Sequence, residues 1–115
     1  MRALVFAIVL TLAATPAVAE TIAPNEARNH VGQYVTVEGA VSGVQHAASG
    51  SVTFIDMGGS YPNNTFTSII FKDDADKFPD VDTLDGKTID VTGSIRLYQG
   101  RPEIILNDPA QLKAK

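Results

Sequence analysis

Apolar and polar residues alternate along several separate stretches of the chain. This predicts β-strands, because neighbouring side chains of a strand point to opposite faces. The predicted strands cover residues 34–41, 51–55, 66–71, 88–95 and 102–106. Residues 66–71 carry apolar residues on both faces, which suggests that this strand is at least partly covered on both sides. The apolar positions of each stretch are expected to face one common core. These positions are Val35, Val37, Val41, Val52, Phe54, Ile69, Phe71, Ile89, Val91, Ile95, Ile104 and Leu106.

Two segments outside these strands predict short helices. Residues 21–30 have Pro24 where a first helical turn would lie, and no β-branched residue follows it before the segment ends. In the acidic connector 72–85, Asp73 and Asp74 can cap a helix that Pro79 ends. One helix therefore precedes the first strand, and the other lies between the third and fourth strands.

The order of these elements predicts an all-β domain, a five-stranded Greek-key barrel of the OB-fold type with these two short helices. Gly39, within the first strand, predicts the bulge or sharp bend that such barrels require. Residues 56–64 predict a long turn, and residues 98–100 a tight hairpin in which Gly100 suits a positive φ. An SH3-like barrel or a half-formed sandwich is the alternative, but SH3-like barrels usually have only a short turn in place of the 72–85 connector.

The N-terminal segment has the layout of a secretory signal peptide. Arg2 precedes an apolar run over residues 3–14, Pro16 breaks this run, and residues 17–19 give the small-x-small pattern of a cleavage site. A membrane anchor is the alternative, but the run is short for the ~30 Å of a bilayer core. We therefore expect a signal peptide over residues 1–19, cleaved before Glu20. Residues 20–115 would then form one domain in the periplasm or the medium, with no membrane span.

The chain is acidic, with a formal net charge of −4, and it contains no cysteine. This charge disfavours a strong generic nucleic-acid binder, because Lys and Arg supply most of the affinity for phosphates. The lack of cysteine excludes disulfides, thiol catalysis and cysteine-based zinc sites. The sequence also has none of the common motifs for an activated nucleophile or a phosphate-binding loop. We therefore expect a protein that is not an enzyme.

No metal and no cofactor are expected. The aspartates between residues 73 and 85 suggest calcium, but an EF-hand loop starting at Asp74 or Asp80 would lack the glycine required at its sixth position. A solvated acidic face is the alternative interpretation. His30 and His46 are far apart in the sequence and would share a metal only if the fold brought them together.

Two stretches resemble OB-fold nucleic-acid-binding domains of the tRNA-anticodon and helicase type. One is YVTVEGAV at residues 34–41, and the other is GKTIDVTGSI at 86–95, followed by YQGRPEI at 98–104. The Asn-Asp-Pro step at 107–109 also fits the end of such a domain. The resemblance covers residues 31–112 and is closest to small exported bacterial OB-fold proteins of unassigned role. It implies the barrel fold and the binding of single-stranded nucleic acid.

OB-folds bind ligands across the second and third strands, between the loop after the first strand and the last hairpin. Aromatic rings on this surface could stack on bases, and arginines could pair with phosphates. We expect Tyr98 and Arg101 to contribute most, although Tyr98 could instead pack at the hairpin corner and Arg101 could be solvated or pair with Glu103. The candidate ligand-binding residues are His46, Thr53, Tyr61, Phe66, Lys72, Arg96, Tyr98 and Arg101.

Two function classes remain open at this point. The resemblance implies a binder of single-stranded nucleic acid. The acidity and the expected export favour a periplasmic interaction module that binds an envelope protein, a glycan or a small ligand through the same face.

Overall fold

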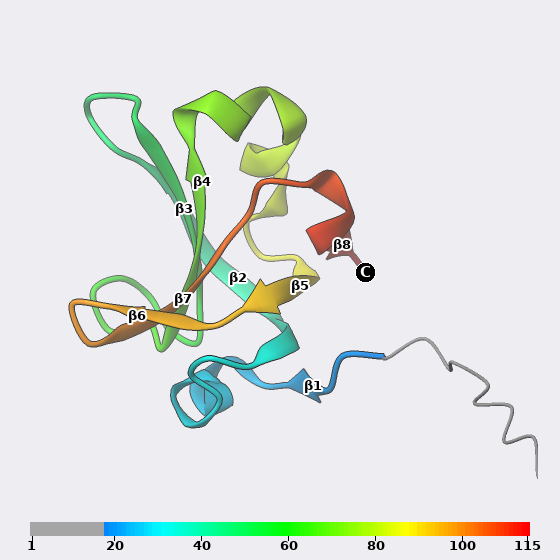
Figure 1. Ribbon diagram of the computed structural model, residues 1–115. Helices are drawn as coiled ribbons and strands as arrows, with labels where there is room; N and C mark the ends of the chain where they lie inside the picture. Colours follow the sequence, from blue (N-terminus) through cyan, green and yellow to red (C-terminus); the bar gives the residue numbers. More distant parts are fainter. Residues whose placement is uncertain (1–17) are drawn as a thin grey trace, which may run out of the picture.

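The computed structural model describes residues 18–115 as an all-β protein with one mixed eight-stranded sheet and several short 3₁₀-helices (Figure 1). The expected signal peptide lies almost entirely outside the described residues, so it stays a prediction. Over residues 18–115, no helix is long and apolar enough to cross a membrane. The elements are β1 (Thr21–Ile22), η1 (Pro24–Asn29), β2 (Tyr34–His46), β3 (Val52–Met57), β4 (Phe66–Phe71), η2 (Lys72–Lys77), η3 (Val81–Leu84), β5 (Thr88–Ser94), β6 (Arg96–Tyr98), β7 (Arg101–Ile105), η4 (Pro109–Gln111) and β8 (Leu112–Ala114).

Strand β2 organises the sheet because it pairs with different strands along its length. Residues 34–40 pair antiparallel with β5, and residues 41–46 pair antiparallel with β3. The full order is β6-β7-β4-β3-β2-β5-β8, with β1 parallel to β2 and β4 parallel to β7. The strands curve around the core in Figure 1 but do not close into a barrel, because β6 and β8 end the hydrogen-bonded order.

The bend in β2 lies at residues 41–43, whereas the sequence predicted it at Gly39. The pairing with β3 shifts register between Val41 and Gly43, which lets β2 leave β5 and turn toward β3. Gly39 stays in regular pairing with Ile89. A Cβ at Gly39 would lie 2.6 Å from Pro24 Cγ, so the glycine permits the close approach of η1 to the sheet.

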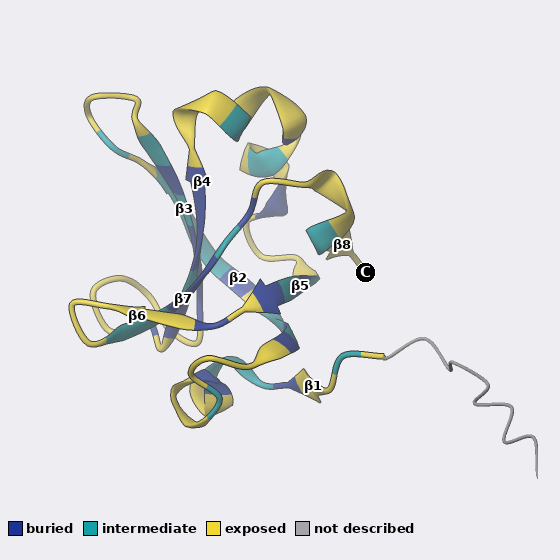
Figure 2. Cartoon of the chain, in the orientation of Figure 1, coloured by how far each residue is buried: buried dark blue, intermediate teal, exposed yellow. Residues whose placement is uncertain are grey.

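One face of each long strand fills the core (Figure 2). The prediction is confirmed for the first, fourth and fifth predicted strands, where Val35, Val37, Val41, Ile89, Val91, Ile95, Ile104 and Leu106 are buried. It is wrong for β3 and β4, where Val52, Phe54 and Phe71 occupy the face opposite the core. Ile69 shares that face, although it is buried at 5% exposed. The core residues of these two strands are instead Ile55, Met57, Phe66 and Ile70. Both faces of β3 and β4 carry apolar residues, so alternation alone does not identify the inward face.

The predicted helices are shorter than expected and differently divided. Residues 21–22 pair with β2 as strand β1, so the N-terminal helix is reduced to η1. The acidic connector contains two 3₁₀-helices in place of one helix, and Phe78 between them and Leu84 in η3 pack against the core. The predicted hairpin is confirmed between β6 and β7, where Gln99 and Gly100 have φ of 51 and 76°.

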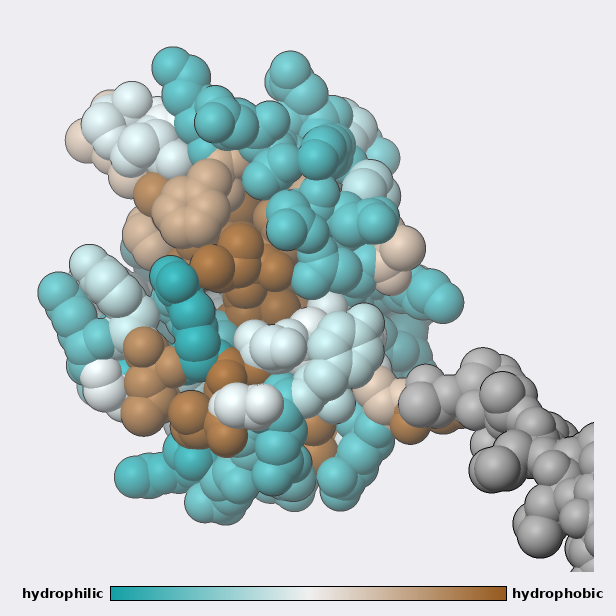
Figure 3. Space-filling view, in the orientation of Figure 1, coloured by the Kyte–Doolittle hydropathy of each residue, from teal (hydrophilic) through white to brown (hydrophobic). Residues whose placement is uncertain are grey.

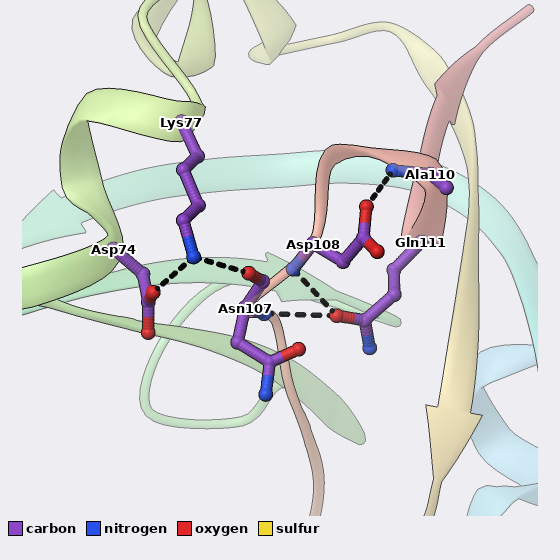
Figure 4. A network of polar contacts seen from close by, with 6 residues as sticks. All are labelled: Asp74, Lys77, Asn107, Asp108, Ala110 and Gln111. Atoms are coloured by element: carbon purple, nitrogen blue, oxygen red, sulfur yellow. Dashed lines mark hydrogen bonds and ion pairs between the residues drawn. The ribbon is translucent and has the colours of Figure 1, made fainter.

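The side chain of Gln111 fixes the C-terminal segment to the sheet (Figure 4). Its Oε1 accepts hydrogen bonds from the backbone N–H groups of Asn107 and Asp108, at 2.8 and 3.0 Å. Its Nε2 donates to the backbone carbonyls of Thr92 and Ile105, both at 3.0 Å. These bonds hold β8 beside β5, at the opposite end of the strand order from β6 and β7.

Candidate functional site

The face of β3, β4 and β7 that points away from the core carries an apolar cluster. Val52 lies opposite Phe71 in the β3–β4 pairing, and Phe54 lies opposite Ile69, which is itself paired with Ile105 of β7. Phe71 is 40% exposed. In Figure 3, hydrophobic residues gather over β4 and β7 with hydrophilic residues around them. We call these five residues the outer apolar patch.

A polar row crosses the same face beside the outer apolar patch. Asp56, Thr67, Glu103 and Arg96 occupy successive register positions on β3, β4, β7 and β6. Thr67 Oγ1 donates to Asp56 Oδ1 at 3.0 Å, and Arg96 Nε donates to Glu103 Oε1 at 2.6 Å. From β2, Gln45 Nε2 donates to Asp56 Oδ2 at 2.9 Å. Two carboxylates therefore lie in a polar row directly beside the outer apolar patch.

Asp56 is only 2% exposed, and its carboxylate accepts hydrogen bonds from three neutral side chains. Beside Thr67 and Gln45, the third donor is Asn64 Nδ2, at 3.3 Å from Oδ1. Burial raises the pKa of Asp56, and the Thr67 hydrogen bond, the charge of Arg101 and the Gln45 hydrogen bond oppose that shift. A further donor brought by a ligand would stabilise the charged form of this carboxylate.

Arg101 connects the β6–β7 hairpin to the turn between β3 and β4. Its Nη2 donates to Asn64 Oδ1 at 2.7 Å and to the backbone carbonyls of Pro62 and Asn64 at 2.9 and 3.1 Å. Its Cζ lies 5.8 Å from the centroid of the Tyr61 ring, within the range of a cation–π contact. The turn therefore holds Arg101, whereas the sequence left open that it is solvated or pairs with Glu103.

Two tyrosine rings flank a hollow on this face. Tyr61 and Tyr98 are 60% and 58% exposed, so Tyr98 is not packed away at the hairpin corner. With Phe54, Asp56 and Glu103 they line a hollow of about 240 Å³, which we call the tyrosine pocket. A second hollow of about 230 Å³ shares Phe54, Tyr98 and Glu103 with it and extends over the outer apolar patch. The shared lining makes the two hollows one continuous surface.

Four of the predicted site residues lie together on this surface, namely Tyr61, Arg96, Tyr98 and Arg101. Phe66 does not belong to it, which corrects the prediction. Phe66 is 1% exposed and packs in the core, because the inward face of β4 contains residues 66, 68 and 70.

Three further predicted residues lie elsewhere. Thr53 and His46 are paired across β3 and β2, with His46 Nδ1 3.0 Å from Thr53 Oγ1. Thr53 is buried on the inward face of β3, and His46 Nε2 lies 2.6 Å from Asp82 Oδ1 of η3. These contacts join the β2–β3 hairpin to the connector. Lys72 is exposed at the start of η2 and lines neither hollow.

Sequence reasoning missed Gln45, Phe54, Asp56, Asn64, Thr67 and Glu103 as lining residues. A signal was available in β3, because Phe54 and Asp56 are two positions apart and so must share a face. Because Phe54 was expected to face the core, Asp56 was not expected on a ligand-binding face. Nothing local to the sequence indicates that Asn64 would bind both Asp56 and Arg101.

Two other features of the described chain have a weaker case as sites. Among residues 18–115, no group of three or more His, Asp or Glu side chains could hold a metal ion. A larger open hollow of about 460 Å³ lies between β1, β2, β5 and the C-terminal segment. Part of its wall is Val18 and Ala19, the first described residues, and its lining includes the ring of Tyr34. The outer face combines more aromatic surface with buried carboxylates, so we place the candidate site there.

Comparisons with known proteins show a shared fold. No protein-family model and no curated protein matches the chain. The solved structure of the OBody AM1L10 bound to hen egg-white lysozyme has a TM-score of 0.61 and 16% identity, over 88% of this chain and 98% of that one. A Leishmania major Friedlin protein described as an aspartyl-tRNA synthetase has a TM-score of 0.57 and 11% identity over 90% of this chain. The match spans only 22% of the synthetase chain.

Proposed function

We propose that the chain is an exported OB-fold binding protein whose outer face binds single-stranded nucleic acid. The observation that carries this proposal is the pair of exposed rings, Tyr61 and Tyr98, flanking a hollow beside the outer apolar patch. Stacking of a base on an aromatic side chain is worth about 1–3 kcal/mol. OB-folds use the corresponding face for oligonucleotides. The fold shared with part of a protein described as an aspartyl-tRNA synthetase supports the same ligand class.

The strand pairings support the OB-fold assignment. The five strands of the proposed fold are β2, β3, β4, β5 and β7. Strand β2 pairs with both β3 and β5, the connector with η2 and η3 lies between β4 and β5, and β7 runs parallel to β4. The remaining short strands β1, β6 and β8 extend the edges of this arrangement.

The charges on the face favour contact with bases over contact with phosphates. Arg96 is paired with Glu103, and Arg101 is held by the turn that contains Asn64. The carboxylates of Glu103 and Asp56 on the same face offset these two cations, so little net positive charge remains for phosphate oxygens. Because phosphate neutralisation produces the salt dependence of nucleic-acid binding, we expect a shallow dependence of affinity on salt.

A second candidate function is the binding of a protein partner through the same face. The outer apolar patch favours it, since partly exposed Phe54 and Phe71 lie beside Val52 and Ile69, with the paired charges of Arg96 and Glu103 in the same hollow. The OBody that shares this fold is bound to hen egg-white lysozyme, a protein. The expectation that the chain is not an enzyme stays part of the proposal in either case.

The deciding experiment is an anisotropy titration of fluorescent single-stranded oligonucleotides with the purified protein. Tyr98→Ala should weaken binding about tenfold or more, because one stacking platform is lost. Tyr34→Ala is the matched control. Tyr34 is 64% exposed, but it lies on β2 and lines the separate hollow of about 460 Å³ near the C-terminal segment. No binding by the parent protein, or equal loss from the two variants, would overturn the proposal. Saturable binding of an envelope protein in place of any oligonucleotide would favour the second candidate.

Export is a separate part of the proposal. The N–H of Thr36 donates to the carbonyl of Glu20 at 2.8 Å, so the sheet takes up the chain directly after the expected cleavage point. Cleavage before Glu20 would therefore leave these hydrogen-bonded residues intact. Intact-mass measurement of the secreted protein tests this, and recovery of the full-length chain in the membrane fraction would contradict it.

A further inference from the structure

The tyrosine pocket has hydrogen-bond acceptors at its base and aromatic rings at its sides. Asp56 and Glu103 line the hollow while being only 2% and 4% exposed, as expected for residues at the bottom of a concavity. Tyr61 and Tyr98 line the same hollow and are more than half exposed. A ligand in this hollow would therefore meet exposed aromatic rings and buried carboxylates.

This arrangement excludes some groups and suits others. A phosphate would meet the carboxylates of Asp56 and Glu103 as well as the guanidinium of Arg101, so the pocket offers it little net attraction. A flat group that carries donors along one edge would stack on a ring and donate to the acceptors. Among the nucleobases, thymine and uracil have one N–H between two carbonyl groups, and these carbonyls would face a carboxylate. Guanine has two adjacent donors, N1–H and the N2 amino group, which match the two oxygens of a carboxylate.

Glu103 is the carboxylate placed to receive these donors. Each oxygen of Asp56 already accepts at least one hydrogen bond from Gln45, Asn64 or Thr67. Glu103 accepts from Arg96 through Oε1, and a carboxylate can accept about four hydrogen bonds in total. Glu103 also lines both hollows of the face.

We infer that the tyrosine pocket is a base-specificity site for guanine, which stacks on Tyr98 and donates from N1–H and the N2 amino group to Glu103. This inference rests on the proposed function and adds the base that the pocket selects. In this arrangement Arg96 orients Glu103. Arg101 positions the Tyr61 wall through its bonds to Pro62 and Asn64.

The test compares three thymine-rich single strands with the parent protein. One contains scattered guanines, one has inosine in place of each guanine, and one contains thymine alone. Inosine lacks only the N2 amino group, so the comparison isolates one donor without altering the protein. The guanine strand should bind about tenfold more tightly than the thymine strand, with the inosine strand between them. Equal affinity for all three would overturn the pocket inference and leave the proposed function standing.

Glu103→Gln provides the second arm, with thermal unfolding as a check of its fold. This variant should bind the guanine and thymine strands with equal affinity, because the carboxylate that receives the two guanine donors is lost. Asp76→Asn is the control, because it removes one carboxylate charge from an exposed position on η2. It should keep the preference for guanine. Retained preference in Glu103→Gln would overturn the assigned role of Glu103. Failure of the parent to bind any strand, with capture of an arginine-containing peptide instead, would overturn the proposed function as well.

Discussion

The guanidinium of Arg101 lies over the ring of Tyr61, with 5.8 Å between Cζ and the ring centroid. The two residues belong to different hairpin turns, and the same guanidinium donates to Pro62 and Asn64. Arg101 therefore connects the β6–β7 hairpin, which carries Tyr98, to the turn that carries Tyr61.

Arg101→Ala should lower the free energy of unfolding by about 1–3 kcal/mol, because the three acceptors in the turn lose a charged donor. Urea denaturation followed by circular dichroism measures the change. Arg101→Lys should restore only part of the loss, since a single ammonium does not reproduce the planar fork of the guanidinium. Lys113→Ala, at an exposed position on β8, is the control. Equal stability of Arg101→Ala and the control would contradict the structural role given to Arg101.

Asp56 should make the protein more stable as the pH falls from neutrality. Burial raises its pKa above the ordinary value of 3.8, so the folded protein takes up this proton at a higher pH than the unfolded chain does. The stability contributed by Asp56 is therefore fully present below the ordinary pKa and is lost as the pH rises through the folded-state pKa. The measurement is the free energy of unfolding of the parent and of Asp56→Asn at a series of pH values. The parent-minus-variant difference should grow as the pH falls. A constant difference, or one that shrinks, would show that the direction of the pKa shift is wrong.

Truncation of two apolar residues of the β3–β4 hairpin should affect stability and ligand binding to different extents. Ile55→Ala should cost about 2–5 kcal/mol of stability, because Ile55 is fully buried and a cavity would remain. Phe71→Ala should cost less, since its ring is 40% exposed on the outer face. It should also weaken ligand binding, which Ile55→Ala should not do while the protein stays folded. Thermal unfolding together with the oligonucleotide titration separates the two effects. A larger stability loss from Phe71→Ala would place that ring in the core after all.

The contacts in Figure 4 predict unequal roles for two polar side chains. Gln111→Ala should destabilise the protein by about 1–3 kcal/mol, because it leaves the part-buried carbonyls of Thr92 and Ile105 without their side-chain donor. Lys77→Ala should cost less than about 1 kcal/mol. Its ion pair with Asp74 and its bond to the Asn107 carbonyl are on the surface. Hydrogen exchange of the β8 amides should rise in the Gln111 variant and stay near the parent rate in the Lys77 variant. The reverse order would contradict the role given to Gln111.

The candidate site could be predicted only in part. The exposed rings and the arginine of the last hairpin were expected, because the fold type places that hairpin at the edge of the ligand face. The carboxylates were not expected, since their role depends on partners far along the chain. Asp56 is bonded to Gln45 of β2 and to Asn64 of the following turn, and Glu103 is paired with Arg96 across a hairpin. These contacts exist only once β3, β4 and β7 lie side by side.

By itself, the sequence determined approximately where the five longer strands and the tight hairpin lie, but not the short strands β1, β6 and β8. Residues 66–71 form β4 as predicted, and Gln99 and Gly100 turn the last hairpin. Alternation and turn chemistry are local properties, so they can be read from neighbouring residues. Only the tertiary structure decided which faces of β3 and β4 are inward. Phe54 and Ile55 are both apolar, and packing against β2 places Ile55 in the core and Phe54 on the outer face. A sheet whose two faces are both apolar has no local signal for the choice, because the free energy that decides it is gained only when the whole core assembles.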